Sequence, residues 1–225
     1  MTVSKFVCFC LVLICFNAFN QSVLRFVPCL GSQAIELGKE YTIAEGRISF
    51  QSIKFYVSDF RTLTENGKLI KHWPTTLVNL EDSSSQSIGE IDSAAVRIDF
   101  LLGTDSLSNV SGILEGALDP INGMYWAWNS GYINVKSEGL YRDSTGKEFP
   151  FEFHLGGYLA PNATVRFLSF DVNPQRGIPQ LVILMDDWLT YAFEKGIYSL
   201  MIPGKISAEL ATKVQASIQL TYRHE

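Results

Sequence analysis

Apolar and polar residues alternate with a period of two over several stretches of this chain. The clearest runs are Ile53–Val57, Val96–Leu102 and Phe149–Leu155. Successive side chains of a β-strand point to opposite faces, so each run predicts a strand with one face in a core. In the third run the phenylalanines share the apolar phase, and we expect Glu152 and His154 to point away from the core.

Further segments have the length and composition of strands and are separated by turn residues. They are Leu24–Cys29, Ile133–Glu138, Thr164–Phe170, Leu181–Met185, Ile197–Ile202 and Ser217–Tyr222. Two short helices are predicted late in the chain, one from Asp186 or Asp187 to Lys195 and one from Ser207 to Gln215. A strand with one apolar face needs a second sheet to cover it. The predicted fold class is therefore all-β, an antiparallel β-sandwich of about ten strands with one or two short helices near the C-terminus.

The first residues have the layout of a secretory signal peptide. Lys5 precedes an unbroken apolar run, Phe6–Phe16, and polar residues follow from Asn17. So short a run cannot span a bilayer as a helix. We expect residues 1–20 to be removed on export. Residues 21–225 should then form a single domain in the periplasm or outside the cell, with no transmembrane span.

Charge and cysteine content narrow the functional classes. Lys and Arg number 18 against 23 Asp and Glu, a formal net charge of −5. With no basic cluster, nucleic-acid binding is not expected. Cys29 alone of the four cysteines follows the predicted signal peptide, so it has no internal disulfide partner and is expected to be a buried thiol.

Motifs of the common enzyme classes are absent from the sequence. It has neither a nucleophile elbow nor a phosphate-binding glycine loop. Glu115, Asp119 and Glu138 have no spacing that would fix a glycosidase carboxylate pair. We therefore expect a protein that is not an enzyme. Two glycosylation sequons begin at Asn109 and Asn162, and we expect both asparagines in exposed loops.

Candidate chemistry is concentrated between Gly112 and Glu138. In an extended segment Met124, Trp126 and Trp128 would share one face. An aromatic plug of the core is one interpretation. A ligand, metal or redox site is the other, because thioethers and indoles are soft and oxidisable groups.

A second element is His154, which is followed closely by Gly156 and Gly157. A histidine on a polar strand face is commonly solvated, but adjacent glycines also permit close backbone approach at a site. A turn near Asp143–Lys147 should return the chain as an antiparallel hairpin. We therefore expect His154 beside the start or middle of the strand that begins at Ile133, close to the tryptophans.

Four segments together resemble the MbnP-like family of exported, methanobactin-associated copper-binding proteins. They are IKFYVSDF (53–60), LLGTDSLSNVSG (101–112), LDPINGMYWAWNSGYINVKSEG (118–139) and FEFHLGG (151–157). In copper-handling members a dihaem, peroxidase-like partner oxidises a tryptophan to kynurenine, which binds copper together with histidine. The resemblance implies His154 as a ligand and Trp126 or Trp128 as the oxidised residue. Copper(I) accepts few, soft ligands, so Met124 is a further candidate.

The chain departs from some relatives, which carry extra cysteines and a histidine in the loop before the tryptophans. Here that loop is SLSNVSG, and the other histidines, His72 and His224, are expected to be exposed. Two functions therefore remain open. One is copper storage or handling, and the other is a metal-free binding module that uses the Met124–Tyr132 aromatic cluster for a small ligand or a protein partner.

Overall fold

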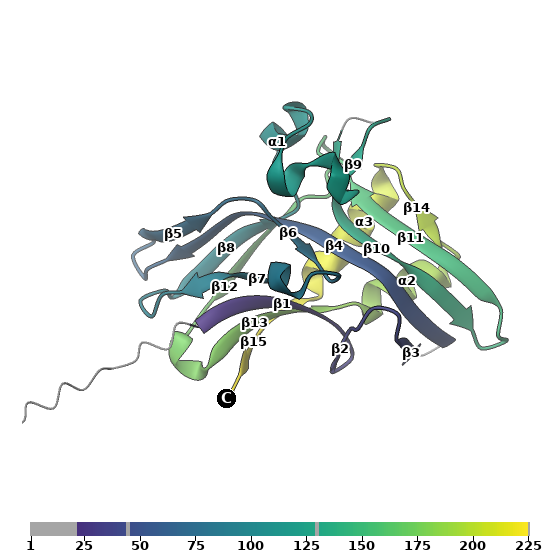
Figure 1. Cartoon of the computed structure of the whole chain (residues 1–225), viewed down its shortest axis with the longest axis horizontal. Coiled ribbons are helices and arrows are strands. Elements are labelled where there is room, and N and C mark those ends of the chain that lie inside the picture. Colours follow the sequence, from purple (N-terminus) through teal and green to yellow (C-terminus); the bar gives the residue numbers. More distant parts are fainter. Residues whose placement is uncertain (1–21, 44–45, 129–130, 225) are drawn as a thin grey trace, which may run out of the picture.

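Two β-sheets pack face to face in the computed structural model, which describes residues 22–43, 46–128 and 131–224 (Figure 1). The first sheet has the order β15-β13-β1-β2, with β7 also paired to β1. Its strands are β1 (Ser22–Leu30), β2 (Gln33–Ala34), β7 (Ser87–Ile91), β13 (Ile178–Leu184) and β15 (Ile218–Arg223). The predicted signal peptide lies outside the described residues.

The second sheet is larger and has the order β12-β8-β4-β10-β11-β14. The strands on this path are β4 (Gly46–Leu63), β8 (Arg97–Leu102), β10 (Gly131–Asp143), β11 (Glu148–Gly156), β12 (Arg166–Asp171) and β14 (Ser199–Leu200). Short strands pair with β4 and β10 beside it, namely β3 (Glu40–Ile43), β5 (Leu69–Trp73), β6 (Thr76–Asn79) and β9 (Tyr125–Trp126).

Helices are few and short. The α-helices are α1 (Ser106–Val110), α2 (Asp186–Glu194) and α3 (Lys205–Ala216). The 3-10 turns are η1 (Ser83–Gln86), η2 (Gly116–Leu118), η3 (Pro120–Asn122) and η4 (Pro174–Arg176). Both helices predicted late in the chain are present, although α3 begins two residues before the expected Ser207. Among the described residues, no helix is both long and apolar enough to cross a membrane.

The β-sandwich prediction is confirmed, but the sheets are mixed rather than wholly antiparallel. Strand β1 runs parallel to β13, with Phe26 opposite Leu181, and β14 runs parallel to β11. A parallel pair needs a long crossover, and the chain builds much of the second sheet between β1 and β13. Where β1 ends, the Gly31 amide donates to Asp186 Oδ2 at 2.8 Å.

Aromatic side chains from both sheets fill the space between them. The Phe26 ring of the first sheet lies 5.4 Å from that of Phe55 and 5.5 Å from that of Phe100, edge to face in both cases. Helix α2 adds Trp188, whose ring centroid lies 5.6 Å from that of Phe153. Such edge-to-face pairs are favourable beyond the area they bury, so these contacts tie the two layers and α2 into one core.

The predicted strand phases hold for β11 and only partly for β8. Phe153 is wholly buried and Glu152 is exposed, which confirms the prediction for that strand. Val96 was expected in the core but is 40% exposed, because β8 begins only at the following residue. Asp99 was expected to face solvent but is buried, and its Oδ1 accepts a hydrogen bond from Ser169 Oγ at 2.6 Å.

Two further sequence predictions have different outcomes. Cys29 is a free, buried thiol, as expected. Asn109 was expected in an exposed loop, but it is only 3% exposed. Its amide nitrogen donates to Thr104 Oγ1 and its Oδ1 accepts from the Tyr132 amide, so the side chain is needed inside the fold.

The segment that carries α1, η2, η3 and β9 rises from the second sheet at the top of the view, over β4 and β10 (Figure 1). It covers a second, smaller apolar cluster, separate from the main core, that contains Tyr56, Leu118, Met124, Trp126, Tyr132 and Ile133. Tyr56 alternates along β4 with Phe55 and Val57, which belong to the main core. Tyr56 therefore faces away from the main core, and this segment covers the side chain and buries it completely.

Candidate functional site

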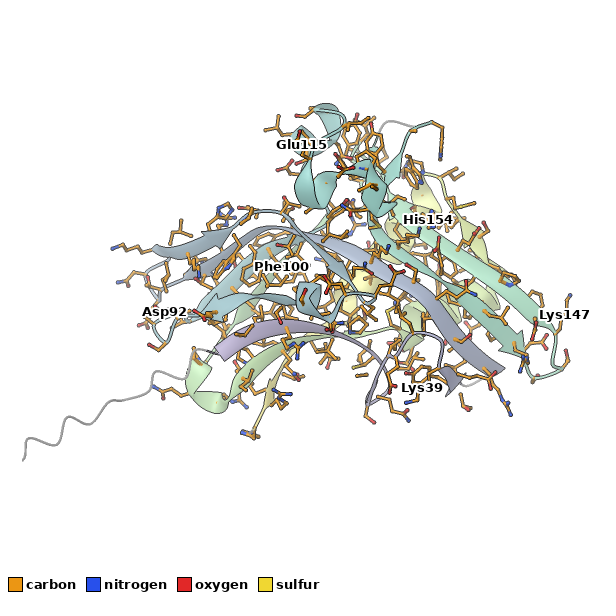
Figure 2. The ribbon with its side chains drawn as sticks, viewed as in Figure 1. Lys39, Asp92, Phe100, Glu115, Lys147 and His154 are labelled. Atoms are coloured by element: carbon orange, nitrogen blue, oxygen red, sulfur yellow. The ribbon has the colours of Figure 1, made fainter. Side chains whose placement is uncertain are left out.

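A row of ionisable side chains lies on the outer face of the β10–β11 hairpin. Lys136 on β10 is opposite His154 on β11. Glu138 Oε1 lies 2.7 Å from His154 Nε2 and 3.0 Å from Lys136 Nζ. The three side chains are 12% to 24% exposed, so their charges are only partly screened by solvent. Figure 2 shows His154 on β11, toward the end of the strand near the α1–β9 segment.

The protonation states within this row follow from burial and from Lys136. Burial lowers the pKa of the His154 imidazole, and the hydrogen bond to Glu138 opposes this effect without reversing it. Burial acts to raise the pKa of Glu138, but hydrogen bonds from His154 and Lys136 outweigh it and leave the pKa lowered. At neutral pH the row therefore holds an ammonium ion, a carboxylate and a neutral imidazole.

A neutral imidazole has one donor and one acceptor nitrogen. Because Nε2 faces the Glu138 carboxylate, we assign the proton to Nε2 and the free lone pair to Nδ1. Within the described residues His154 Nδ1 has no hydrogen-bond partner. A carboxylate that orients one ring nitrogen and leaves the other free is the arrangement found behind many metal-binding histidines.

Trp126 packs against β11 at Gly156. A Cβ atom at Gly156 would lie 2.6 Å from Trp126 Cζ3, closer than van der Waals contact allows. The indole therefore occupies the space where any other residue would place its side chain. His154 precedes Gly156 by two residues and shares its face of the strand. Same-face neighbours in a strand are about 6.5 Å apart, so the structure brings Trp126 to the same part of the hairpin as His154.

Trp128 is the neighbour of Trp126 but has a different environment. The two ring centroids are 5.5 Å apart, with the planes tilted by 40°. The alternation predicted that they share a face, and the rings are indeed adjacent. However, β9 ends at Trp126, which is 5% exposed, whereas Trp128 is 63% exposed. The structure thus distinguishes two residues that the sequence pattern treated alike.

Met124 is completely buried in the cluster with Tyr56 and Tyr132. Its carbonyl accepts a hydrogen bond from the Ile133 amide at 2.9 Å. The ring of Tyr132 lies 5.8 Å from that of Tyr56 and 5.0 Å from that of Tyr125, edge to face in both cases. The interpretation of this block as an aromatic plug therefore applies to Met124 and Trp126, and the exposed Trp128 is outside it.

A buried network of amides and hydroxyls holds the loops around this cluster. Asn134 Oδ1 accepts from the Thr104 amide at 2.9 Å, and Asn134 Nδ2 donates to Thr164 Oγ1 at 2.8 Å. Asn109 joins the network through Thr104. Buried polar groups that are fully paired fix a single arrangement, so the loops on both sides of β10 are positioned by one residue, Asn134.

The remaining histidines are exposed, as expected. His72 Nε2 lies 3.2 Å from Asp59 Oδ1 on the β4–β5 hairpin, and its side chain is 49% exposed. His224 follows β15 and is also exposed. In the described part of the chain, no three residues among His, Cys, Asp and Glu are grouped as a metal site. A copper ion would therefore have one imidazole, His154, together with soft or modified neighbours.

A single neutral imidazole next to soft, oxidisable side chains fits a soft metal ion of low coordination number. His154 offers a neutral, carboxylate-oriented imidazole, and the indole of Trp126, from β9, packs at Gly156 on the same face of β11. These groups do not fit ions such as zinc, whose structural sites need four nitrogen, sulfur or oxygen ligands. The sequence analysis did not identify Glu138 and Lys136 as partners of His154. The two-residue spacing of Lys136 and Glu138 on the predicted strand, opposite His154, was the available signal.

Comparisons with known proteins agree on one relationship. The family model MbnP matches residues 20–197. Among solved structures, MbnP from Methylosinus trichosporium superposes with a TM-score of 0.52 and 17% sequence identity, covering 83% of this chain and 82% of that chain. At that identity the superposition supports the fold alone. No curated protein is significantly similar in sequence.

Proposed function

This chain belongs to the MbnP family, and from that premise we propose that it is an exported, non-enzymatic protein that binds copper for storage or handling. The observation that carries the proposal is the pair His154–Glu138. A carboxylate 2.7 Å from Nε2 orients the ring and leaves the lone pair of Nδ1 free to bind a metal ion. Copper(I), when bound, would contribute a soft centre that accepts few ligands.

We further propose that Trp126 is the tryptophan that is oxidised to kynurenine. Its indole packs on Gly156, two residues from His154, so a modified side chain there would remain on the face of the imidazole. Trp128 is more exposed and is the alternative. A dihaem, peroxidase-like partner is the proposed catalyst of this oxidation, with peroxide as the oxidant, and Met124 is the proposed further soft group.

The experiment is the purification of the full chain from its native host, followed by metal analysis and peptide mass mapping. We expect copper to copurify, and we expect the mass change of kynurenine on the peptide that contains Trp126. Trp126→Phe should remove that mass change, and Trp128→Phe should not. Modification of Trp128 in the wild-type protein would overturn the assignment of Trp126.

A second comparison tests the ligand. His154→Ala should abolish copper binding, whereas His72→Ala and His224→Ala should retain it because both rings are exposed and lie outside the hairpin row. Retention of copper by His154→Ala would refute the ligand assignment. If the native protein carries neither copper nor a modified tryptophan, the chain is instead a metal-free binding module.

A further inference from the structure

A pocket of about 260 Å³ lies beside Trp126. None of the described residues that line it carries a charged side chain, in contrast to the charged row on the hairpin. Four segments form it: β9, the start of β10 at Gly131, the loop 157–162 that follows β11, and the turn 203–204 that precedes α3. None of these lining residues other than Trp126 belongs to the proposed copper site. The pocket therefore adjoins the proposed copper site at Trp126, and its other walls are distinct from that site.

The walls of the pocket are mainly apolar. Trp126, Leu159 and Pro203 contribute the larger apolar side chains. Gly157 has a φ of +115°, and a Cβ atom there would lie 2.9 Å from Pro203 Cβ. Glycine at this position lets the loop after β11 approach the turn before α3 and close one side of the pocket.

The loop that lines the pocket is fixed by buried hydrogen bonds. The Thr164 amide donates to the Gly157 carbonyl at 2.9 Å, and Thr164 Oγ1 is also within 3.2 Å of that carbonyl. Thr164 Oγ1 in turn accepts from Asn134 Nδ2 on β10. A pocket whose walls are anchored in this way is already formed before a ligand arrives, which lowers the entropic cost of binding.

Two polar side chains in the lining are free to bind. The Asn162 amide and the Tyr158 hydroxyl have no hydrogen-bond partner within the described residues, although both side chains are partly buried. Small-molecule sites usually combine apolar walls with a few polar groups that fix orientation. The Asn162 amide offers both a donor and an acceptor, and the Tyr158 hydroxyl can act as either.

We propose that this pocket binds a neutral molecule of one aromatic ring that carries a hydrogen-bonding substituent, such as a phenol. The volume is below that of most sites for drug-sized ligands and suits a single ring. A charged ligand would lose hydration without meeting an opposite charge. The Trp126 indole favours an aromatic ring, and Asn162 and Tyr158 supply the polar contacts.

The test uses the metal-free full chain and phenol as the probe, followed by backbone and indole NMR shifts. We expect saturable binding, with shifts confined to Gly131, residues 157–162 and 203–204, and the Trp126 indole. Benzoate, which adds a charge to the ring, should bind about tenfold more weakly or worse. Cyclohexanol, which keeps the hydroxyl and loses aromaticity, should bind about threefold more weakly or worse.

Variants assign the polar contact. Asn162→Leu keeps a similar volume but removes the amide, so phenol binding should weaken about fivefold or more, whereas toluene binding should not weaken. Asn66→Leu is the matched control, since Asn66 is exposed in the β4–β5 loop, and it should leave phenol binding unchanged. Absence of saturable phenol binding, or shifts that map elsewhere in the wild-type protein, would overturn the proposal. Because no metal is present, this result is independent of the copper proposal.

Discussion

Glu138 Oε1 lies 2.7 Å from His154 Nε2, across the β10–β11 hairpin and two positions from the register partner of His154, Lys136. Burial lowers the pKa of the imidazole, and the positive charge of Lys136, which also binds the carboxylate, acts in the same direction, so the ring stays neutral instead of forming an ion pair. This contact determines which ring nitrogen is free, and it also couples the hairpin to pH.

The pKa of His154 should be below its usual value of 6.5, because burial penalises the imidazolium ion. The unfolded chain then binds more protons at this residue than the folded chain, so stability should decrease as pH falls through and below about 6.5. NMR titration of the ring, together with thermal unfolding between about pH 7 and about pH 5, would measure both effects. Glu138, whose pKa is lowered, loses its stabilising contribution only at lower pH, below its usual 4.5. A His154 pKa above 6.5 would contradict the prediction.

Replacement of Gly156 by alanine should destabilise the fold by about 1–3 kcal/mol, because the new methyl group overlaps Trp126 Cζ3 and the Tyr132 carbonyl oxygen. Urea unfolding would measure the loss. In a Trp126→Leu background the side-chain overlap is removed and the loss should be smaller, although the clash with the carbonyl remains. Equal losses in both backgrounds would show that Trp126 does not occupy this space.

Phe153→Ala should cost about 3–5 kcal/mol, because the ring is completely buried against Trp188, Phe151 and Phe193. The adjacent residue provides the control. Glu152 is exposed on the other face, so Glu152→Ala should change stability by no more than about 0.5 kcal/mol. Chemical denaturation of both variants would show comparable losses only if the strand phase were wrong.

Asn134→Ala should destabilise by about 1–3 kcal/mol, because it leaves the Thr104 amide without its partner in a buried site. It also removes the donor to Thr164, so amide exchange should accelerate in the 157–164 loop as well as near Thr104. Asn66→Ala, at an exposed asparagine, should leave both stability and exchange unchanged. Faster exchange near Thr104 alone would show that Asn134 does not couple the two loops.

Local patterns predicted the parts of the structure that depend on neighbours in the chain. The alternation in Phe149–Leu155 gave the correct faces for Phe153 and His154, and the turn at Asp143–Lys147 gave the correct hairpin. Asp143 Oδ1 accepts hydrogen bonds from the Thr145 and Lys147 amides, which explains why that turn is so clearly encoded.

Non-local features were not predictable in the same way. Tyr56 has the pattern of a residue on a polar face, and only the return of residues 112–126 over the sheet buries it. Trp126 and Trp128 have the same residue type and the same phase, but packing on Gly156 separates their environments. The parallel partner of β1 could not be inferred either, because no local signal specifies a strand so distant in the chain.

The pairing of β1 with β13 has a consequence for how the chain reaches its fold. The hydrogen bond from Gly31 to Asp186, beside this pair, spans 155 positions. A contact between residues so distant in the sequence requires a large loop to close, at a cost in chain entropy, before the contact contributes stability. Domains rich in such contacts fold in milliseconds to seconds rather than microseconds. Until β13 emerges during synthesis, β1 lacks its central neighbour and the first sheet cannot be completed. The chain should therefore remain incompletely folded throughout most of its synthesis, the condition in which an extended polypeptide can still be threaded through a narrow channel.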